Sequence, residues 1–354
     1  MMKRNVSKKT EKKSPPKPRK KNALKRIEQC TVWIAQCHNH PYAFFERAYY
    51  KHQLGDFEGA LLDYDEGLRL RPDDEWGLNG RGILKSDLGD NLGALEDYDK
   101  LIALNPKCKE AYHNRAISNF ETGNVQEAIV DFSMAIKIDP GKIDSYWGRA
   151  DAKSRQGDFR GAVEDYNEII FLDPDFAKAW YFRAIDKFMM GDYQGAIDDY
   201  DNALELDPKL TEIYYNRALA KSQFFEYAGA IEDYTKAIAL NPRFVLAYLN
   251  RANTKYDMYE NEGALEDNLK VLELEPENIY AMTHIGIIKS EMGDGRGAYE
   301  LFCRVIKIDP KYGRVYLYRG ILLMDLGYRE AARKDLIYAA SLGVRDAYEV
   351  LNDD

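Results

Sequence analysis

Apolar residues recur along most of the chain at intervals of three and four positions, in short runs separated by polar turns. In residues 195–204, for example, alanine, isoleucine, tyrosine and leucine have the spacing of one face of an amphipathic helix. Between runs stands a glycine with aspartate or asparagine after it, as at Gly157 and Asp158. Glycine adopts the left-handed conformation that ends one helix, and aspartate caps the next. The pattern therefore predicts helix, turn, helix, turn.

The predicted hairpins repeat with a fixed period. Eight evenly spaced prolines mark it: Pro72, Pro106, Pro140, Pro174, Pro208, Pro242, Pro276 and Pro310. At a constant distance before each proline is an alanine, from Ala60 to Ala298, and Ala332 extends the series to a ninth repeat. A second position, occupied by Ala48 in the first repeat, is always alanine or glycine. A period of about 34 residues indicates stacked helical hairpins, and the small residues let the two helices of a hairpin approach closely.

These positions, together with an aromatic residue in most second helices such as Tyr64 and Phe302, resemble the tetratricopeptide repeat (TPR) family. Counted from Pro41, nine repeats cover residues 41–346. The resemblance implies an all-α fold, a right-handed superhelical α-solenoid of helix-turn-helix repeats. The chain departs from the family pattern where Phe225 and Tyr259 replace the turn glycine. It also departs at Asn268 and Leu336, which replace the aromatic residue, and at Val344, which replaces the last proline.

The ends of the chain fall outside the repeats. Residues 1–21 cannot bury apolar surface, so we expect a disordered basic arm. Residues 22–40 are expected to form an N-terminal capping helix, with Ile27 and Trp33 available to cover the first repeat. A short cap is expected at residues 347–354, where Tyr348 and Leu351 would contact the ninth repeat. Such caps are needed because the end repeats of a solenoid otherwise expose an apolar face.

Charge is divided unevenly along the chain. Residues 1–26 hold twelve Lys or Arg and one acid, a net charge of about +11, which leaves about −20 for the rest of the chain. The stretch from Lys3 to Arg26 therefore suggests contact with nucleic acid or an anionic surface, or a nuclear import signal in a eukaryotic cell. A purely solubilising tail and an arm that folds back into the acidic groove of the solenoid are the alternatives.

A charged pair recurs at fixed positions of the repeat. An arginine in the first helix and an aspartate in the second lie almost level in an antiparallel hairpin, so we predict a bidentate pair within each repeat. The pairs are Arg47 and Asp63, Arg81 and Asp97, Arg115 and Asp131, Arg149 and Asp165, Arg183 and Asp199, Arg217 and Asp233, Arg251 and Asp267, and Arg319 and Asp335. Ile285 and Leu301 replace both in the eighth repeat, where we expect different packing. A ladder of arginines that binds phosphates or carboxylates is the functional alternative.

Signals for catalysis or a metal are absent from the sequence. It has no G-x-x-x-x-G-K-[ST] phosphate loop, no H-E-x-x-H zinc helix and no G-x-S-x-G elbow, so we expect no enzyme and no cofactor. Cys30, Cys37, His38 and His40 are close in sequence, but their spacing matches no familiar zinc site. The four scattered cysteines, the lack of an apolar span and the lack of a signal-peptide core favour a cytoplasmic protein, or a nuclear one in a eukaryote.

The first helices remain as the candidate functional surface, because in the family they line a concave groove that holds peptides. The residues placed on this face by their position in the repeat are Tyr42, Phe45, Tyr49, Trp76, Asn79, Asp87, Glu110, His113, Phe120, Asp144, Trp147, Asp151, Tyr181, Phe188, Tyr215, Asn253 and Tyr256. Aromatic side chains supply contact area and carboxylates select basic partners. We therefore expect a noncatalytic scaffold that binds a basic or aromatic-rich protein segment, although some of these aromatics could instead pack between helices.

One known specificity of the family is disfavoured. Its chaperone-binding members hold a C-terminal carboxylate with Lys, Arg and Asn side chains on consecutive first helices. Asn114, Asn216 and Asn250 occupy one matching position, but Asn79 and Tyr181 stand where neighbouring lysines are expected. A chaperone-tail adaptor is therefore not expected.

Overall fold

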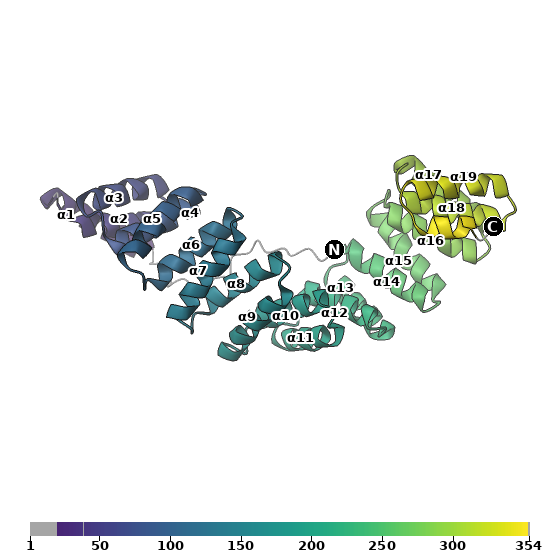
Figure 1. The fold of residues 1–354 in the computed structure, drawn as a ribbon, viewed down its shortest axis with the longest axis horizontal. Helices are drawn as coiled ribbons and strands as arrows, with labels where there is room; N and C mark the ends of the chain where they lie inside the picture. Colours follow the sequence, from purple (N-terminus) through teal and green to yellow (C-terminus); the bar gives the residue numbers. More distant parts are fainter. Residues whose placement is uncertain (1–19, 38, 353–354) are drawn as a thin grey trace. The chain divides into compact units, whose positions relative to one another are not determined.

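The regular secondary structure is entirely helical in residues 20–37 and 39–352, the part of the chain that the computed structural model describes (Figure 1). The chain divides into two compact regions, Met1–Gly191 and Asp192–Asp354. The N-terminal region contains α1 (Lys20–Gln36), α2 (Pro41–Leu54), α3 (Phe57–Leu70), α4 (Glu75–Asp87), α5 (Asn91–Leu104), α6 (Lys109–Glu121), α7 (Val125–Ile138), α8 (Ile143–Arg155), α9 (Phe159–Leu172) and α10 (Ala177–Met189). The C-terminal region contains α11 (Tyr193–Leu206), α12 (Thr211–Gln223), α13 (Tyr227–Leu240), α14 (Val245–Asp257), α15 (Asn261–Leu274), α16 (Ile279–Glu291), α17 (Gly295–Ile308), α18 (Gly313–Asp325), α19 (Arg329–Ser341) and α20 (Asp346–Asn352).

Each repeat is a pair of helices of 13 or 14 residues, from α2 and α3 in the first repeat to α18 and α19 in the ninth. The turn glycines have φ between 81° and 87°. The following aspartate then caps the second helix, as where Asp158 Oδ1 accepts from the backbone N–H of Gly161 at 2.9 Å. Phe225 and Tyr259, which lack the conformational freedom of glycine, have φ of 62° and 61°. The turn geometry is therefore kept even where the glycine is lost.

The core of each hairpin is built on the periodic alanines and the aromatic residue of the second helix. Ala60, Ala94 and Ala162 are fully buried, and Tyr64 and Phe302 are nearly so. The ring of Tyr64 reaches the next repeat, where a Cβ atom on Gly80 would lie 2.5 Å from its hydroxyl. The predicted close-packing positions thus form the core between the helices of a hairpin.

In its contacts, α1 occupies the position that the second helix has in a repeat. Arg47 Nη1 donates to Thr31 Oγ1 at 3.2 Å, and Arg81 Nη1 makes the equivalent bond to Asp65 one repeat later. Cys30, one repeat length before Tyr64, is buried like it. The helix begins at Lys20 and ends at Gln36, so it starts earlier and ends sooner than the expected 22–40.

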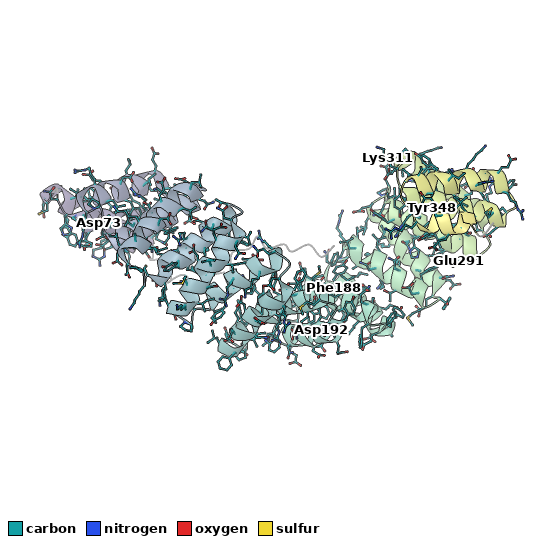
Figure 2. The ribbon with its side chains drawn as sticks, in the orientation of Figure 1. Asp73, Phe188, Asp192, Glu291, Lys311 and Tyr348 are labelled. Carbon is teal, nitrogen blue, oxygen red and sulfur yellow. The ribbon has the colours of Figure 1, made fainter. Side chains whose placement is uncertain are left out.

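At the other end, α20 follows the ninth repeat (Figure 2). The hydroxyl of Tyr348 donates to the carbonyl of Ala340 at 3.2 Å, and Leu351 packs against the last apolar cluster. Among the described helices, none is both long and apolar enough to cross a membrane. The basic arm falls almost wholly outside the described residues, apart from its last positions on α1.

Candidate functional site

The charged pair forms in seven repeats of the described chain. Each arginine donates from Nε to one aspartate oxygen at 2.7–3.0 Å and from Nη2 to the other at 2.5–2.8 Å. The aspartates are nearly fully buried, for example Asp165 at 2% exposed. Hydrogen bonding to Asp131 raises the pKa of Arg115 above its ordinary value. Arg183 and Asp199 belong to different compact regions, and their pair stays a prediction.

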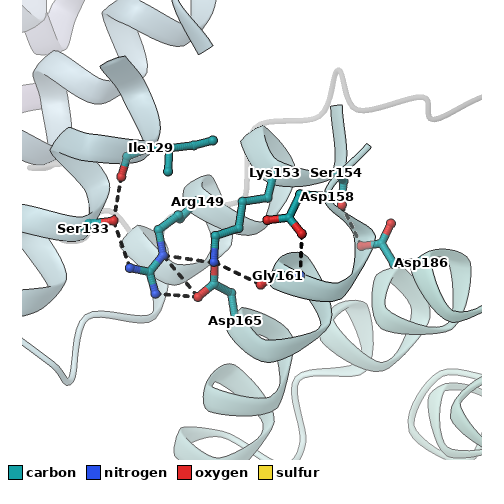
Figure 3. Close-up of polar contacts among 9 residues, drawn as sticks. All are labelled: Ile129, Ser133, Arg149, Lys153, Ser154, Asp158, Gly161, Asp165 and Asp186. Carbon is teal, nitrogen blue, oxygen red and sulfur yellow. Dashed lines mark hydrogen bonds and ion pairs between the residues drawn. The ribbon is translucent and has the colours of Figure 1, made fainter. Parts of the chain in front are cut away.

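A lysine completes most of these pairs, and the sequence reasoning missed it. In the fourth repeat, Lys153 Nζ lies 2.8 Å from Asp165 Oδ2 and donates to the carbonyl of Gly161 at 3.1 Å (Figure 3). Lys51, Lys85, Lys221 and Lys255 contact their aspartates at 2.8–2.9 Å. Each lysine lies one helical turn after the arginine, so its recurrence in the sequence could have revealed it.

The arginine also links consecutive repeats. Its Nη1 donates to a residue on the preceding second helix, which is Ser133 for Arg149 at 3.0 Å (Figure 3). For Arg115 the acceptor is Asp99, at 2.6 Å. We predicted only the pair within a repeat, but one guanidinium holds three helices together. With its donors occupied and its side chain 13–23% exposed, the arginine has a structural role that leaves little for a ligand.

The eighth repeat replaces this network with apolar packing. Ile285 is buried, and Leu301 packs against the cluster around Phe302. Lys289, at the lysine position, has no aspartate to bind there and instead contacts Asp294 Oδ2, in the turn, at 2.6 Å. In this repeat the lysine therefore contacts the N-terminal cap of α17 and not an aspartate inside the hairpin.

The structure divides the predicted groove residues by exposure. Six are exposed: Tyr42, Trp76, Asp87, Glu110, Asp144 and Asn253. Eight are partly buried: Tyr49, Asn79, Phe120, Trp147, Tyr181, Phe188, Tyr215 and Tyr256. Three are buried: Phe45, His113 and Asp151.

Phe45 is a core residue and cannot contact a partner, which corrects its placement in the groove. A Cβ atom on Gly67 or Gly77 would lie 2.3 or 2.6 Å from its ring, so the two glycines create the space that the phenyl group fills. His113 and Asp151 are buried as well, so they are also corrected as groove residues. His113 Nδ1 lies 3.0 Å from Ser145 Oγ, and its ring packs against Phe132. Asp151 lies 3.5 Å from Arg155.

Four of the exposed residues form a row along the N-terminal region. Tyr42, Trp76, Glu110 and Asp144 are each one repeat length apart, so they occupy one equivalent position on α2, α4, α6 and α8. These helices contact one another in order. The buried ring of Phe45 lies edge-on to both aromatic members, with centroids 6.2 Å from Tyr42 and 6.0 Å from Trp76. We call these four residues the first-helix row: two exposed aromatic rings followed by two carboxylates.

Trp147 sits in an aromatic cluster rather than in the row. Its ring contacts Phe182 at 5.1 Å, Phe176 at 5.5 Å and Tyr166 at 5.7 Å between centroids. Trp147 therefore contributes to packing between helices as well as to the surface. This was the alternative interpretation of the aromatic residues.

In the C-terminal region, Tyr215 and Tyr256 also have internal partners. Asn250 Nδ2 donates to the hydroxyl of Tyr215 at 2.9 Å, and burial raises the pKa of Tyr215. The hydroxyl of Tyr256 donates to Glu291 on the next first helix, and its ring packs edge-on against His284. Asn253 is exposed. Of the predicted residues in this region, Asn253 is thus the most available to a partner.

The cysteine and histidine cluster gives no metal site in the residues described. Within residues 20–37 and 39–352, no three His, Cys, Asp or Glu side chains are grouped so as to hold a metal ion, and His38 lies outside that range. Burial raises the pKa of Cys30 to about 11, which disfavours the thiolate that a metal needs.

Three tetratricopeptide repeat models match the sequence, over residues 79–143, 187–223 and 211–244. The helix pairs repeat with the same period outside these segments. This chain is an array of tetratricopeptide repeats. No match was found among curated proteins.

Solved structures share the TPR fold. The C-terminal part of a TPR repeat-containing protein from Cytophaga hutchinsonii has a TM-score of 0.61 at 18% identity, covering 68% of this chain and 99% of that one. A TPR protein from Parabacteroides merdae has a TM-score of 0.51 at 20% identity, covering 70% and 98%. The TPR fold is typical of noncatalytic scaffolds for protein–protein interaction.

Proposed function

We propose that this TPR protein binds a protein segment rich in basic and aromatic or other apolar residues, along the first helices of residues 41–155. The first-helix row carries the proposal. Tyr42 and Trp76 are 45% and 43% exposed, and Glu110 and Asp144 stand at the equivalent position on the next two first helices. An extended segment along the row would place apolar side chains on the rings and Lys or Arg beside the carboxylates.

Two features favour binding over packing at this row. Large aromatic side chains are usually buried in a repeat core, as the ring of Tyr64 is, but Tyr42 and Trp76 keep nearly half of their surface in solvent. The guanidinium of Arg71 lies 5.3 Å from the centre of the Tyr42 ring and donates to its hydroxyl, so a cation is already stable beside this ring. A basic side chain of a partner would make the same contact on an open ring face.

The test is an array of 15-residue peptides probed with the full chain, followed by titration of the selected peptides. We expect selected peptides to be enriched in Lys or Arg together with aromatic residues. Trp76→Ala should weaken their binding at least tenfold, and Glu110→Gln with Asp144→Asn should reduce both affinity and its dependence on salt. Phe171→Ala, which removes an exposed ring from the second helix α9, is the matched control and should leave binding unchanged. Peptides without such a preference, or undiminished binding by Trp76→Ala, would contradict the proposal.

A further inference from the structure

Two turns in the C-terminal region combine backbone strain with exposed aromatic rings. Phe225 and Tyr259 are the non-glycine residues with positive φ in the described part of the chain. Glycine stands at the equivalent position in the other repeats, for instance Gly191 and Gly293. A side chain with a Cβ atom is destabilised in the left-handed region. The sixth and seventh repeats therefore have an aromatic residue at a position where the left-handed backbone conformation favours glycine.

The side chains of these two residues make little packing contact that could offset the strain. Phe225 is 78% exposed and Tyr259 is 93% exposed. The ring of Phe225 has an edge-on contact with Tyr227 of the same turn. Strained backbone and exposed apolar surface at one place are both typical of binding sites.

The neighbouring turns extend this exposed apolar surface. We call residues 223–227, 257–261, 291–295 and 325–329 the rim surface; they are the turns between the helices of the sixth to ninth repeats. Its further exposed apolar residues are Phe224, Met258, Met292, Leu326 and Tyr328. In the third and fourth repeats the polar residues Thr122 and Gln156 stand at the position of Phe224 and Met258.

Consecutive turns of the rim surface lie side by side. Just before the sixth turn, Ser222 Oγ lies 3.2 Å from Thr254 Oγ1 on the next first helix. Just before the seventh turn, the hydroxyl of Tyr256 donates to Glu291, which lies at the eighth turn. These contacts join the C-terminal ends of the first helices α12, α14 and α16, so the sixth, seventh and eighth turns are neighbours along one edge.

The rim surface is acidic as well as apolar. It contains six carboxylates and one basic residue, Arg329; the carboxylates are Glu226, Asp257, Glu260, Glu291, Asp294 and Asp325. Of these, Asp294 is paired with Lys289. Glu226 and Glu260 replace the capping Asp or Asn of other repeats, and their side chains accept no capping hydrogen bond. Each carboxylate therefore stands next in sequence to Phe225 or Tyr259 and is not engaged in a capping hydrogen bond.

We infer that the rim surface binds a basic amphipathic helix of a partner protein. The apolar face of such a helix would cover Phe225 and Tyr259, and its Lys and Arg residues would lie beside Glu226 and Glu260. An anionic lipid surface is disfavoured because the same carboxylates would repel its headgroups. This site lies on residues 223–329, apart from the first-helix row, so either one can fail without the other.

The test uses the full chain and a fluorescent 18-residue peptide of lysine and leucine in amphipathic helical order. The double variant Phe225→Gly and Tyr259→Gly restores the residue of the other repeats. We expect it to weaken binding of the peptide at least tenfold while its melting temperature stays equal or rises, because glycine relieves the backbone strain. Glu226→Gln with Glu260→Gln should weaken binding and flatten its dependence on salt.

Two controls and three outcomes decide the proposal. A peptide of the same composition in scrambled order should bind at least tenfold more weakly, and Phe171→Ala should bind the ordered peptide like the parent chain. Unchanged peptide binding by the glycine double variant would overturn the proposal. So would a fall in its melting temperature, which would make the two rings structural. Binding to phosphatidylserine vesicles in preference to the peptide would overturn it as well.

Discussion

At the scale of single residues, side chains compensate for one another in size across the junction of two repeats. Tyr64 fits against the next repeat because a Cβ atom on Gly80 would lie 2.5 Å from its hydroxyl. Phe132 likewise fits because Gly148 has no side chain. Where the aromatic residue is lost, Asn268 is small and the larger His284 takes the position of these glycines, with Asn268 Nδ2 3.0 Å from His284 Nδ1. At these three junctions a large side chain thus faces a small one or none, whereas Tyr166 stacks on Phe182 at the equivalent positions, with centroids 6.4 Å apart.

The partly buried histidine His284 makes stability depend on pH. Burial lowers the pKa of His284 from its ordinary value of 6.5 to about 4. The unfolded chain then binds a proton that the folded chain rejects, so the free energy of unfolding falls as the pH drops below 6.5. We expect a loss of roughly 2 kcal/mol between pH 7 and pH 5 from this group. His284→Asn, which introduces the residue found at this position in other repeats, should lose less over the same range.

The measurement is urea unfolding followed by circular dichroism at pH 7 and pH 5. Carboxylates titrate in both proteins, so the difference between His284→Asn and the parent chain isolates the imidazole. An equal loss of stability in the two proteins would show that His284 is not kept neutral by burial.

At the scale of the element, each hairpin depends on a turn whose backbone must enter the left-handed region. Gly157 has a φ of 85°, and a Cβ atom there would meet nothing within 4 Å. The glycine is therefore needed for its conformation and not for space. Phe225 and Tyr259 show that the repeat tolerates the strained alternative, because the packing of the two helices imposes the turn.

Gly157→Ala should therefore lower the free energy of unfolding by about 1 kcal/mol, through the backbone alone. Gly141→Ala is the matched control, since Gly141 lies in a turn between repeats, lacks a positive φ and has one neighbouring atom at 3.6 Å. The control should change the stability by less than about 0.5 kcal/mol in urea unfolding. Equal effects of the two substitutions would contradict the backbone explanation.

At the scale of the whole molecule, stability is a sum of hairpins and the junctions between them. Within the N-terminal region, the extensive contacts join each helix to those one or two places along the chain. The arginine network follows the same rule, because Arg149 connects α8 to α9 and to the preceding α7. A local defect should therefore weaken one hairpin and its neighbours only.

Asp63→Ala and Asp165→Ala test this additivity. Each leaves an arginine and a lysine without their carboxylate, so each should cost about 3 kcal/mol. Helices α4 to α8 lie between α3 and α9 in the chain of helix contacts. The double variant should therefore lose stability equal to the sum of the two single losses, within about 0.5 kcal/mol. Urea unfolding gives the sum, and hydrogen exchange should show each loss in its own hairpin. Asp73→Ala, at an exposed pair with Lys100, is the control and should change little. A deviation well above this limit would indicate coupling along the array.

The sequence by itself determined the repeat, its register and the aspartate partner of most arginines. Each of these depends on the repeat period, which recurs nine times along the sequence. Only the tertiary structure decided which residues at one position of the repeat meet solvent. Phe45 and Asn79 are equivalent in sequence, yet Phe45 is buried where two glycines make room and Asn79 is only partly buried. Exposure depends on the size of the residue across the junction, which lies on another helix. For the same reason the links from each arginine to the preceding repeat, and the edge formed by the turns of Phe225 and Tyr259, emerged only when the helices were packed.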